Sequence, residues 1–423
     1  MNSPHTGAQW RSRLKIALLT HCWDEGGGVR VVARWLRDAL VATGAYDVDI
    51  HVLATSCADP GSRRLTVPGS WVRPALQRRC DNGSVPHWHW GANAVELEFM
   101  RYRPRRELTV RLRDYDIVQV VAGSPAWAAA AFDCGVPVVL QVATRVAWER
   151  VSQLAMQGGS LRMWRGLMTA ITSHLERSAL HGADAVLVEN ATMLDYVRSS
   201  GQSYVIKAPP GVDTNVFSPP RTGWRREGPL LSVCRLGEPR KGLHRAVLAY
   251  AEMLRQDDSV APLVLAGHGV PPAPVIDLIA TLGLASRIVI RSDVPSGDLA
   301  KLYREASVFI QTSYEEGLGV SVLEAMASGL PVVATQTAGS GETVIDGVTG
   351  WLVPQDDDQD VVAGIADRVL GVLEKNDSCM GDRGREHCVS HFSSHVALRR
   401  FTDVYENLLG RNKVLSAGSP SSG

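Results

Sequence analysis

The chain has 423 residues, of which 45% are hydrophobic and 21% are charged, a composition typical of a soluble globular protein. This length exceeds what one hydrophobic core ordinarily supports and predicts two domains. Because 44 Lys and Arg residues balance 44 Asp and Glu residues, the overall charge gives no reason to expect nucleic acid as a partner.

Strand-like and helix-like segments alternate along the chain, which is the pattern of a parallel sheet covered by helices. The first apolar run, residues 15–20, is followed by three glycines at 26–28 and by a helix through residues 29–40. Residues 57–106 are irregular and rich in Pro, Trp and Arg, and they receive no assignment. The further strands expected in the first half are residues 47–53, 117–121, 136–142 and 185–188.

A second set of such units begins after Pro219 and Pro220, with strands expected at residues 230–234, 263–266, 288–290, 308–311 and 332–334. The chain therefore predicts an α/β fold of two doubly wound, Rossmann-like domains facing each other across a cleft, with a ligand between them. The expected divisions are an N-terminal tail (1–13), a first domain (14–220), a second domain (221–395), a C-terminal helix returning to the first domain (396–415) and a disordered tail (416–423).

The cysteines and the apolar stretches bear on the cellular compartment. Seven cysteines, spread from Cys22 to Cys388 without a repeated short spacing, argue against a disulfide framework or a zinc site and favour a reducing cytosol. The first residues lack the apolar core of a signal peptide, and the stretch 117–132 is too short to span a bilayer. We therefore expect a cytoplasmic protein without a membrane span.

The most informative segment is a glycine-containing loop with the helix that follows it. Gly317 and Gly319 allow the backbone to approach a ligand closely, and the first N–H groups of the helix suit a phosphate. Glu316 precedes the helix and Glu324 lies two turns inside it, so a rise of about 1.5 Å per residue places them about 12 Å apart. This separation is too large for a cooperating acid–base pair. It fits two carboxylates that bind a sugar and a ribose on either side of a diphosphate.

Two cations accompany this segment. Arg235 ends an expected strand, and Lys241 lies at the start of the next helix, so both are expected to face the cleft. There they would stabilise the charge of a departing diphosphate. The alternative is a pair of solvated surface cations.

Five segments in this order resemble the retaining family 4 glycosyltransferases of the GT-B fold. The segments are Gly26-Gly27-Gly28-Val29-Arg30, Pro210-Gly211-Val212-Asp213 with Phe217, Arg235 with Lys241-Gly242, Glu316 with Glu324, and Gly339 with Glu342 and Gly350. The resemblance implies that the first domain binds the acceptor and the second the nucleotide sugar.

The resemblance also implies roles for single residues. Arg235 and Lys241 would hold the pyrophosphate as it leaves, and Glu316 would contact hydroxyls of the donor sugar; these three form the expected catalytic set. Glu324 would bind the ribose. The remaining donor-binding positions are Gly27, Gly28, Gly317, Leu318, Gly319 and Val320.

One departure concerns the donor sugar. Many relatives carry a histidine after the strand at 136–142, where this chain reads Ala143-Thr144-Arg145. His21, after the first strand, is either a residue facing the cleft or a plain loop residue, and it is left out of the catalytic set. Asp184 matches a family position and is expected to be structural.

Other segments bear on the acceptor. Basic residues at 73–79 and 101–106 are either a grip on an anionic acceptor or lipid surface, or a solvated face. Nothing else in the sequence indicates contact with a membrane. The segment His87-Trp88-His89-Trp90 is interpreted as a loop with stacking surfaces for a sugar-like acceptor, because two histidines without a third ligand make a poor metal site.

The resemblance thus implies a metal-independent glycosyltransferase, without a cofactor, that moves a hexose-type sugar from a UDP-sugar, or a GDP-sugar, to an acceptor hydroxyl. The acceptor, whether a small molecule, a glycan or a lipid-linked molecule, is not identified. Two alternatives stay open, a sugar-nucleotide epimerase on the same scaffold and a non-catalytic sugar-nucleotide-binding protein. A dehydrogenase is disfavoured because no Gly-x-Gly-x-x-Gly follows the first strand.

Overall fold

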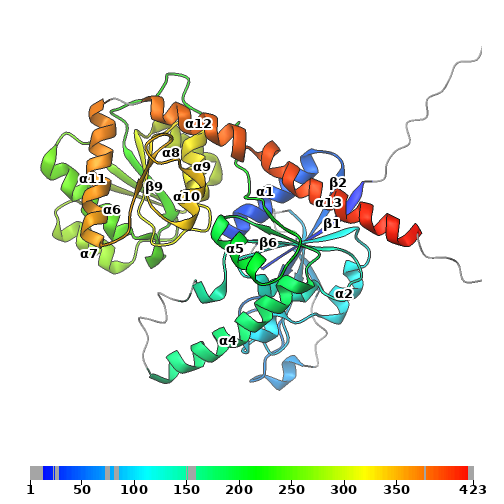
Figure 1. Ribbon diagram of the computed structural model, residues 1–423. Coiled ribbons are helices and arrows are strands. Elements are labelled where there is room, and N and C mark those ends of the chain that lie inside the picture. The colour runs from blue at the N-terminus through cyan, green and yellow to red at the C-terminus, as the bar shows by residue number, and fades with distance from the viewer. Residues whose placement is uncertain are drawn as a thin grey trace, which may run out of the picture.

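The computed structural model describes residues 13–21, 23, 28–71, 77–80, 85–148, 150, 159–375 and 378–417. These residues form two sheets covered by helices, which Figure 1 shows side by side. We call the part built on the eight-stranded sheet the N-lobe and the part built on the six-stranded sheet the C-lobe. The expected fold of two doubly wound α/β units is therefore confirmed.

The N-lobe sheet has the strand order β3-β4-β2-β1-β5-β6-β7-β8, and every neighbouring pair is parallel except β3 with β4. Its strands are β1 (Leu14–Thr20), β2 (Tyr46–Leu53), β3 (Gln77–Cys80), β4 (His87–Trp90), β5 (Ile117–Ala122), β6 (Val138–Val142), β7 (Ala185–Val188) and β8 (Val205–Lys207). The central strands are buried on both faces, as their unbroken apolar runs require.

Helices cover both faces of this sheet. They are α1 (Gly28–Ala42), α2 (Arg106–Leu112), α4 (Gly159–Gly182) and α5 (Ala191–Ser199), with short 3₁₀ turns η1 (Pro68–Ser70), η2 (Glu98–Tyr102) and η3 (Pro125–Ala131). One hydrophobic core lies between the sheet and η3, α4 and α5, and a second lies on the opposite face beneath α1.

The C-lobe sheet is parallel throughout and has the order β11-β10-β9-β12-β13-β14. Its strands are β9 (Leu230–Arg235), β10 (Leu263–His268), β11 (Ile288–Ser292), β12 (Val308–Gln311), β13 (Val332–Thr335) and β14 (Trp351–Val353). Its helices are η4 (Pro239–Lys241), α6 (Leu243–Gln256), α7 (Ala273–Thr281), α8 (Ser296–Glu305), α9 (Val320–Ala327), α10 (Ala338–Thr343) and α11 (Asp358–Lys375).

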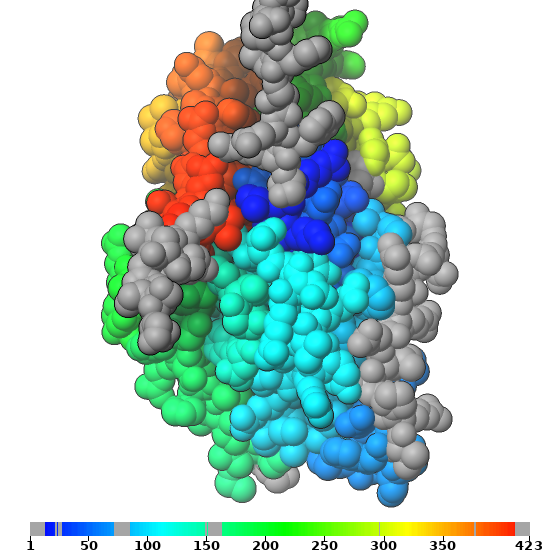
Figure 2. Space-filling model, turned by 90° about the vertical axis from the view of Figure 1, so that its right-hand side faces the viewer, coloured from blue at the N-terminus to red at the C-terminus, as the bar shows by residue number. Residues whose placement is uncertain are grey.

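The last two helices connect the lobes. Helix α12 (Ser378–Phe392) packs in the C-lobe core, and α13 (Ser394–Ala417) then runs across the N-lobe, as Figure 1 shows. Phe401 and Tyr405 of α13 are fully buried beside Ile16 and Leu36, and in Figure 2 the red helix lies next to the blue N-terminal segment. The helix therefore contributes its apolar face to the N-lobe core. Of the tail expected at 416–423, residues 416 and 417 belong to α13, and residues 418–423 lie outside the described residues.

The strand order decides where a ligand-binding site forms. In the C-lobe, β9 has β10 on one side and β12 on the other, so the loops that leave β9 and β12 diverge to opposite faces. A crevice opens outside the carboxyl ends of strands at such a reversal. Strand β9 ends at Arg235 and the loop after it carries Lys241, whereas the loop after β12 carries Glu316.

All ten strands expected from the sequence are present, although several boundaries differ by one or two residues. The interpretation of His87–Trp90 as a loop with stacking surfaces for an acceptor was wrong. These residues form strand β4, in which Trp90 is fully buried and donates a hydrogen bond from its indole N–H to His51 Nδ1 (3.1 Å). The four strands that were not expected from the sequence, β3, β4, β8 and β14, are each three or four residues long.

Candidate functional site

The loops after β9 and β12 meet at a buried ion pair. Lys241 Nζ lies 2.5 Å from Glu316 Oε1, and each residue is 9% exposed. Ser313 donates a further hydrogen bond to the same carboxylate oxygen (2.8 Å). Burial by itself would raise the pKa of Glu316, but Lys241, Arg240 and the Ser313 hydroxyl together lower it below its ordinary value. Glu316 is therefore ionised at neutral pH and able to accept hydrogen bonds from hydroxyl groups.

A left-handed glycine makes this approach possible. Gly242 follows Lys241 with φ 61°, and a Cβ atom there would lie 2.3 Å from the Thr312 carbonyl oxygen. Only glycine permits both the conformation and the close contact between the two loops. The Thr312 hydroxyl donates to the Gly242 carbonyl (3.0 Å), which fastens the loop after β12 to the loop after β9.

Arg235 lies at the end of β9, as expected, and it has an acidic partner. Its guanidinium forms an ion pair with Glu238, whose other carboxylate oxygen contacts Arg240 Nε at 3.0 Å. The Arg235 side chain remains 35% exposed. The cation is thus held at the rim of the crevice, where solvent reaches it.

Helix α9 begins directly after residues 316–319, which we call the donor loop for the role that is proposed for it below. Gly319 is the residue before the helix and has φ 78°, a conformation that side-chain-bearing residues rarely adopt. The Leu318 side chain is buried in the C-lobe core and anchors the loop there. The backbone of the loop can then face the crevice. Val320 is the first residue of α9, whose leading N–H groups have no partner within the helix.

Glu324 lies four residues beyond Val320, about one turn into α9. The expectation of two turns was wrong, because the residues between Glu316 and Val320 form a loop, so the separation of about 12 Å that assumed helical rise throughout does not follow. Tyr303 of α8 donates a hydrogen bond to its carboxylate (2.7 Å). Burial raises the pKa of Glu324 to about 7, an effect that the Tyr303 hydrogen bond only partly offsets. No cation is among the causes of this shift, in contrast to Glu316. The two carboxylates of the motif are therefore differently charged near neutral pH.

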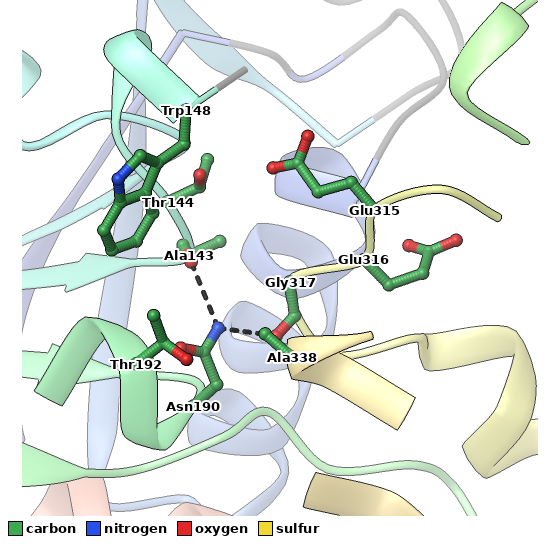
Figure 3. A pocket seen from close by; sticks show the side chains of 9 residues that line it. All are labelled: Ala143, Thr144, Trp148, Asn190, Thr192, Glu315, Glu316, Gly317 and Ala338. Atoms are coloured by element: carbon green, nitrogen blue, oxygen red, sulfur yellow. Dashed lines mark hydrogen bonds between the residues drawn. The ribbon is translucent and has the colours of Figure 1, made fainter. Parts of the chain in front are cut away.

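A cavity of about 190 Å³ lies where the donor loop faces the N-lobe (Figure 3). Its lining comes from both lobes: Ala143, Thr144, Trp148, Asn190, Thr192, Glu315, Glu316, Gly317 and Ala338. In Figure 3 the Glu315 carboxylate points into the space that faces Trp148, whereas the Glu316 carboxylate points away from it, toward the C-lobe. Sequence reasoning identified Glu316 and Gly317 here, and the resemblance drew attention to Ala143 and Thr144. It missed the other N-lobe residues, Trp148, Asn190 and Thr192.

Among the missed residues, Asn190 forms hydrogen bonds to both lobes. Its Nδ2 donates to the Gly317 carbonyl of the donor loop (2.7 Å) and more weakly to the Ala143 carbonyl (3.4 Å), as drawn in Figure 3. The available sequence signal was its position before helix α5, where Asn is a favoured N-cap. Its role between the lobes had no local signal, because Gly317 is 127 residues away.

Several other predicted positions have different surroundings from those expected. Gly28 is the exposed first residue of α1, and Gly27 lies outside the described residues. His21 stacks on Trp127 (4.7 Å between ring centroids) and burial lowers its pKa to about 4, so it is a neutral, packed residue. Arg105 is 3% exposed and donates to the Gly91 carbonyl, so this member of the basic segment is structural.

Asp184 is structural as well, because its carboxylate accepts the backbone N–H of Val138 (2.8 Å). Within the described part of the chain, no three His, Cys, Asp or Glu side chains are grouped so that they could bind a metal ion. No helix among the described residues has the length and apolar character needed to cross a membrane. The side chains of the basic segment at 73–79 are not described.

Two Rossmann-like lobes with a buried Lys–Glu pair and a glycine-bordered helix start at their contact define the architecture of a GT-B transferase. The sequence model of the family "Glycosyl transferases group 1" matches residues 220–385, and that of the "Glycosyl transferase 4-like domain" matches residues 27–205. The chain belongs to the group 1 glycosyltransferases, and it is a transferase enzyme.

Individual proteins agree with this membership. The chain is 27% identical to the MMP alpha-(1->4)-mannosyltransferase of Mycolicibacterium hassiacum over 94% of this chain and 99% of the relative. It is 31% identical to the alpha-maltose-1-phosphate synthase of Mycolicibacterium smegmatis over 56% of this chain and 68% of that protein. The structure of Anabaena HepE in complex with UDP-glucose superimposes with a TM-score of 0.65 at 15% identity, covering 93% of this chain and all of that one.

Proposed function

We propose that this enzyme transfers a hexose-type sugar from a nucleoside diphosphate sugar to an acceptor hydroxyl with retention of the anomeric configuration. The N-lobe would bind the acceptor and the C-lobe the donor. A UDP-sugar is the first candidate, since HepE, which has the same fold, was crystallised with UDP-glucose. A GDP-sugar is the alternative donor.

The observation that carries the proposal is the buried Lys241–Glu316 pair beside the start of α9. Lys241 would interact with the diphosphate as negative charge develops on it, and Glu316 would accept hydrogen bonds from hydroxyls of the sugar. Arg235 would join Lys241 once the diphosphate replaces Glu238 as its partner. The backbone of Gly317, Leu318, Gly319 and Val320 and the carboxylate of Glu324 would complete donor binding, the latter at the ribose.

Catalysis on this proposal is electrostatic. Cations and helix N–H groups that are fixed before the reaction lower the cost of separating charge when the bond between sugar and diphosphate breaks. The acceptor hydroxyl would attack from the face on which the diphosphate leaves, so no side chain has to form a covalent intermediate. Contact between the lobes would exclude water and so limit hydrolysis of the donor.

A thermal-shift screen with UDP-, GDP-, ADP- and TDP-sugars tests donor binding. Ligand at 100 times its dissociation constant stabilises a protein by about 2.7 kcal/mol, so the true donor will raise the melting temperature most. The Lys241→Ala variant serves as the control, because it should lose most of this shift. Product NMR then reports the anomeric configuration. Conversion of a UDP-sugar to an epimer without acceptor, or an inverted product, would overturn the proposal.

A further inference from the structure

The lobes are joined at the cavity by a ring of hydrogen bonds that passes through the start of helix α5. Asn190 Nδ2 donates to the Gly317 carbonyl (2.7 Å), and the next residue, Ala191, donates its backbone N–H to Glu342 Oε1 of α10 (2.6 Å). The ring closes within the C-lobe, where the Gly339 N–H of α10 donates to the Glu316 carbonyl (2.9 Å). The donor loop, α10 and α5 are thus linked in a circuit.

The orientation of the Asn190 side chain follows from its position in the sequence. Its Oδ1 accepts the Met193 N–H (2.8 Å) and so caps α5. Because this bond uses the acceptor end of the amide, the donor end must point away from the helix, toward the donor loop. The Nδ2 group of Asn190 then donates both to the Gly317 carbonyl of the C-lobe and to the Ala143 carbonyl of the N-lobe.

Glu342 fixes the other side of the contact. Its second oxygen lies 2.7 Å from Lys207 Nζ, at the end of β8, so one carboxylate binds two groups of the N-lobe. Helix α10 packs closely against the donor loop, because a Cβ atom on Gly339 would lie 2.6 Å from the Leu318 nitrogen and the Gly339 N–H donates to the Glu316 carbonyl. We therefore expect a shift of Glu342 to move the donor loop with it.

We propose that Asn190 is a positioning residue for the donor loop and that Glu342 is its counterpart on the C-lobe. Together they couple contact between the lobes to the conformation of the backbone that receives the diphosphate. When the lobes meet, the N-lobe fixes the Gly317 carbonyl and thereby aims the N–H groups that follow it. The inference rests on the proposed function, since it assigns these residues to the same donor site.

The sharpest variant is Asn190→Asp. An aspartate keeps the size of the side chain and the N-cap, because its oxygen still accepts the Met193 N–H. It has no N–H to donate, and it directs a negative oxygen at the carbonyls of Gly317 and Ala143. We expect a melting temperature close to that of the wild type and an affinity for UDP and UDP-glucose about tenfold lower, measured by calorimetry. An exposed substitution of the same kind, Asn407→Asp on α13, should change neither quantity.

A second variant approaches the ring from the C-lobe and leaves the α5 cap intact. Glu342→Gln retains an acceptor for the Ala191 N–H and loses the ion pair with Lys207, so a smaller loss of affinity is expected. Because both residues belong to one ring, adding Glu342→Gln to Asn190→Asp should lower the UDP affinity by less than a further factor of about two. Additive losses, or an Asn190→Asp protein with wild-type affinity, would overturn the inference.

Small-angle scattering of the ligand-free protein gives a readout that needs no donor. The double variant should have a larger radius of gyration than the wild type and Asn407→Asp. An unchanged radius would contradict the coupling of the lobes. If neither UDP-glucose nor GDP-mannose stabilises the wild type while the radius does increase, the proposed donor is wrong and the lobe contact stands.

Discussion

Glu189 is a buried carboxyl group at the contact between the lobes, and its ionisation should lower the stability of the protein. It follows strand β7, it is 6% exposed, and its Oε2 lies 3.6 Å from the place that a Cβ on Gly317 would occupy. Burial raises its pKa from 4.5 to about 7, and a hydrogen bond from Gln141 offsets only part of this effect. The substitution Glu189→Gln removes the ionisable group and keeps the shape.

The sign and the size follow from proton linkage. Below pH 4.5 both the folded and the unfolded chain carry the proton at this group. Between pH 4.5 and about 7 the unfolded chain has lost it while the folded chain still holds it, so stability falls as the pH rises. Above pH 7 the deficit is constant. At 1.36 kcal/mol per pH unit the whole interval corresponds to about 3 kcal/mol.

Urea unfolding at several pH values between 4.5 and 8, followed by tryptophan fluorescence, measures this quantity. The difference in unfolding free energy between Glu189→Gln and the wild type should shift by about 3 kcal/mol in favour of the variant as the pH rises. For Glu374→Gln, an exposed substitution on α11, the unfolding free energy should change with pH in the same way as that of the wild type. Parallel curves for Glu189→Gln would refute the reasoning, because they would mean that the carboxyl group titrates alike in both states.

Three further substitutions test the C-lobe side of the site. Lys241→Ala leaves the buried Glu316 without its cation, so we expect a loss of roughly 10²–10³ in turnover and of about 3 kcal/mol in unfolding free energy. Steady-state kinetics and urea unfolding measure the two quantities, and smaller losses in both would contradict a role of the Lys241–Glu316 pair in catalysis and stability. The pKa of Glu324 is about 7, and only its ionised form accepts fully from a ribose, so the UDP affinity of the wild type should rise between pH 6 and pH 8. Glu324→Gln should abolish this rise, and calorimetry at the two pH values that found the same rise in the variant would contradict the prediction. Gly319→Ala, at φ 78°, should lower stability by about 1–2 kcal/mol and weaken donor binding, and a melting temperature equal to that of the wild type would contradict the strain.

The parts of the fold that the sequence predicted are those specified by local pattern. The buried central strands have unbroken apolar runs, and the run at 185–188 matches β7 residue for residue. Strand β4 had no such signal, because its side chains are stabilised by distant partners. Trp90 donates to His51, and His89 contacts Asp59. Its place in the sheet depends on pairing with β2, which lies more than 30 residues away.

The site, too, has a part that local sequence pattern specifies and a part that depends on the whole fold. Glu316, Gly319 and Glu324 belong to one short segment, so glycines, a helix start and a fixed spacing were visible together. The N-lobe side consists of single residues after β6 and β7, and Asn190 was recognisable only as a helix cap. Its hydrogen bond to Gly317 forms because the other lobe brings that carbonyl to its amide, and this approach is a property of the whole fold.

Each cation of the site has an acidic partner, so its charge is compensated in the ligand-free protein. An unpaired buried cation is costly, and Lys241 avoids that cost through Glu316, with which it shares a nearly dry environment. Arg235 is paired at the solvent-exposed rim, where an ion pair contributes little and is readily exchanged. On the proposed function, a diphosphate therefore replaces Glu238 at Arg235 at small cost, whereas Lys241 interacts with it while still bound to Glu316. On the same proposal, the buried pair would set the geometry at the sugar, and the exchangeable pair would admit and release the nucleotide.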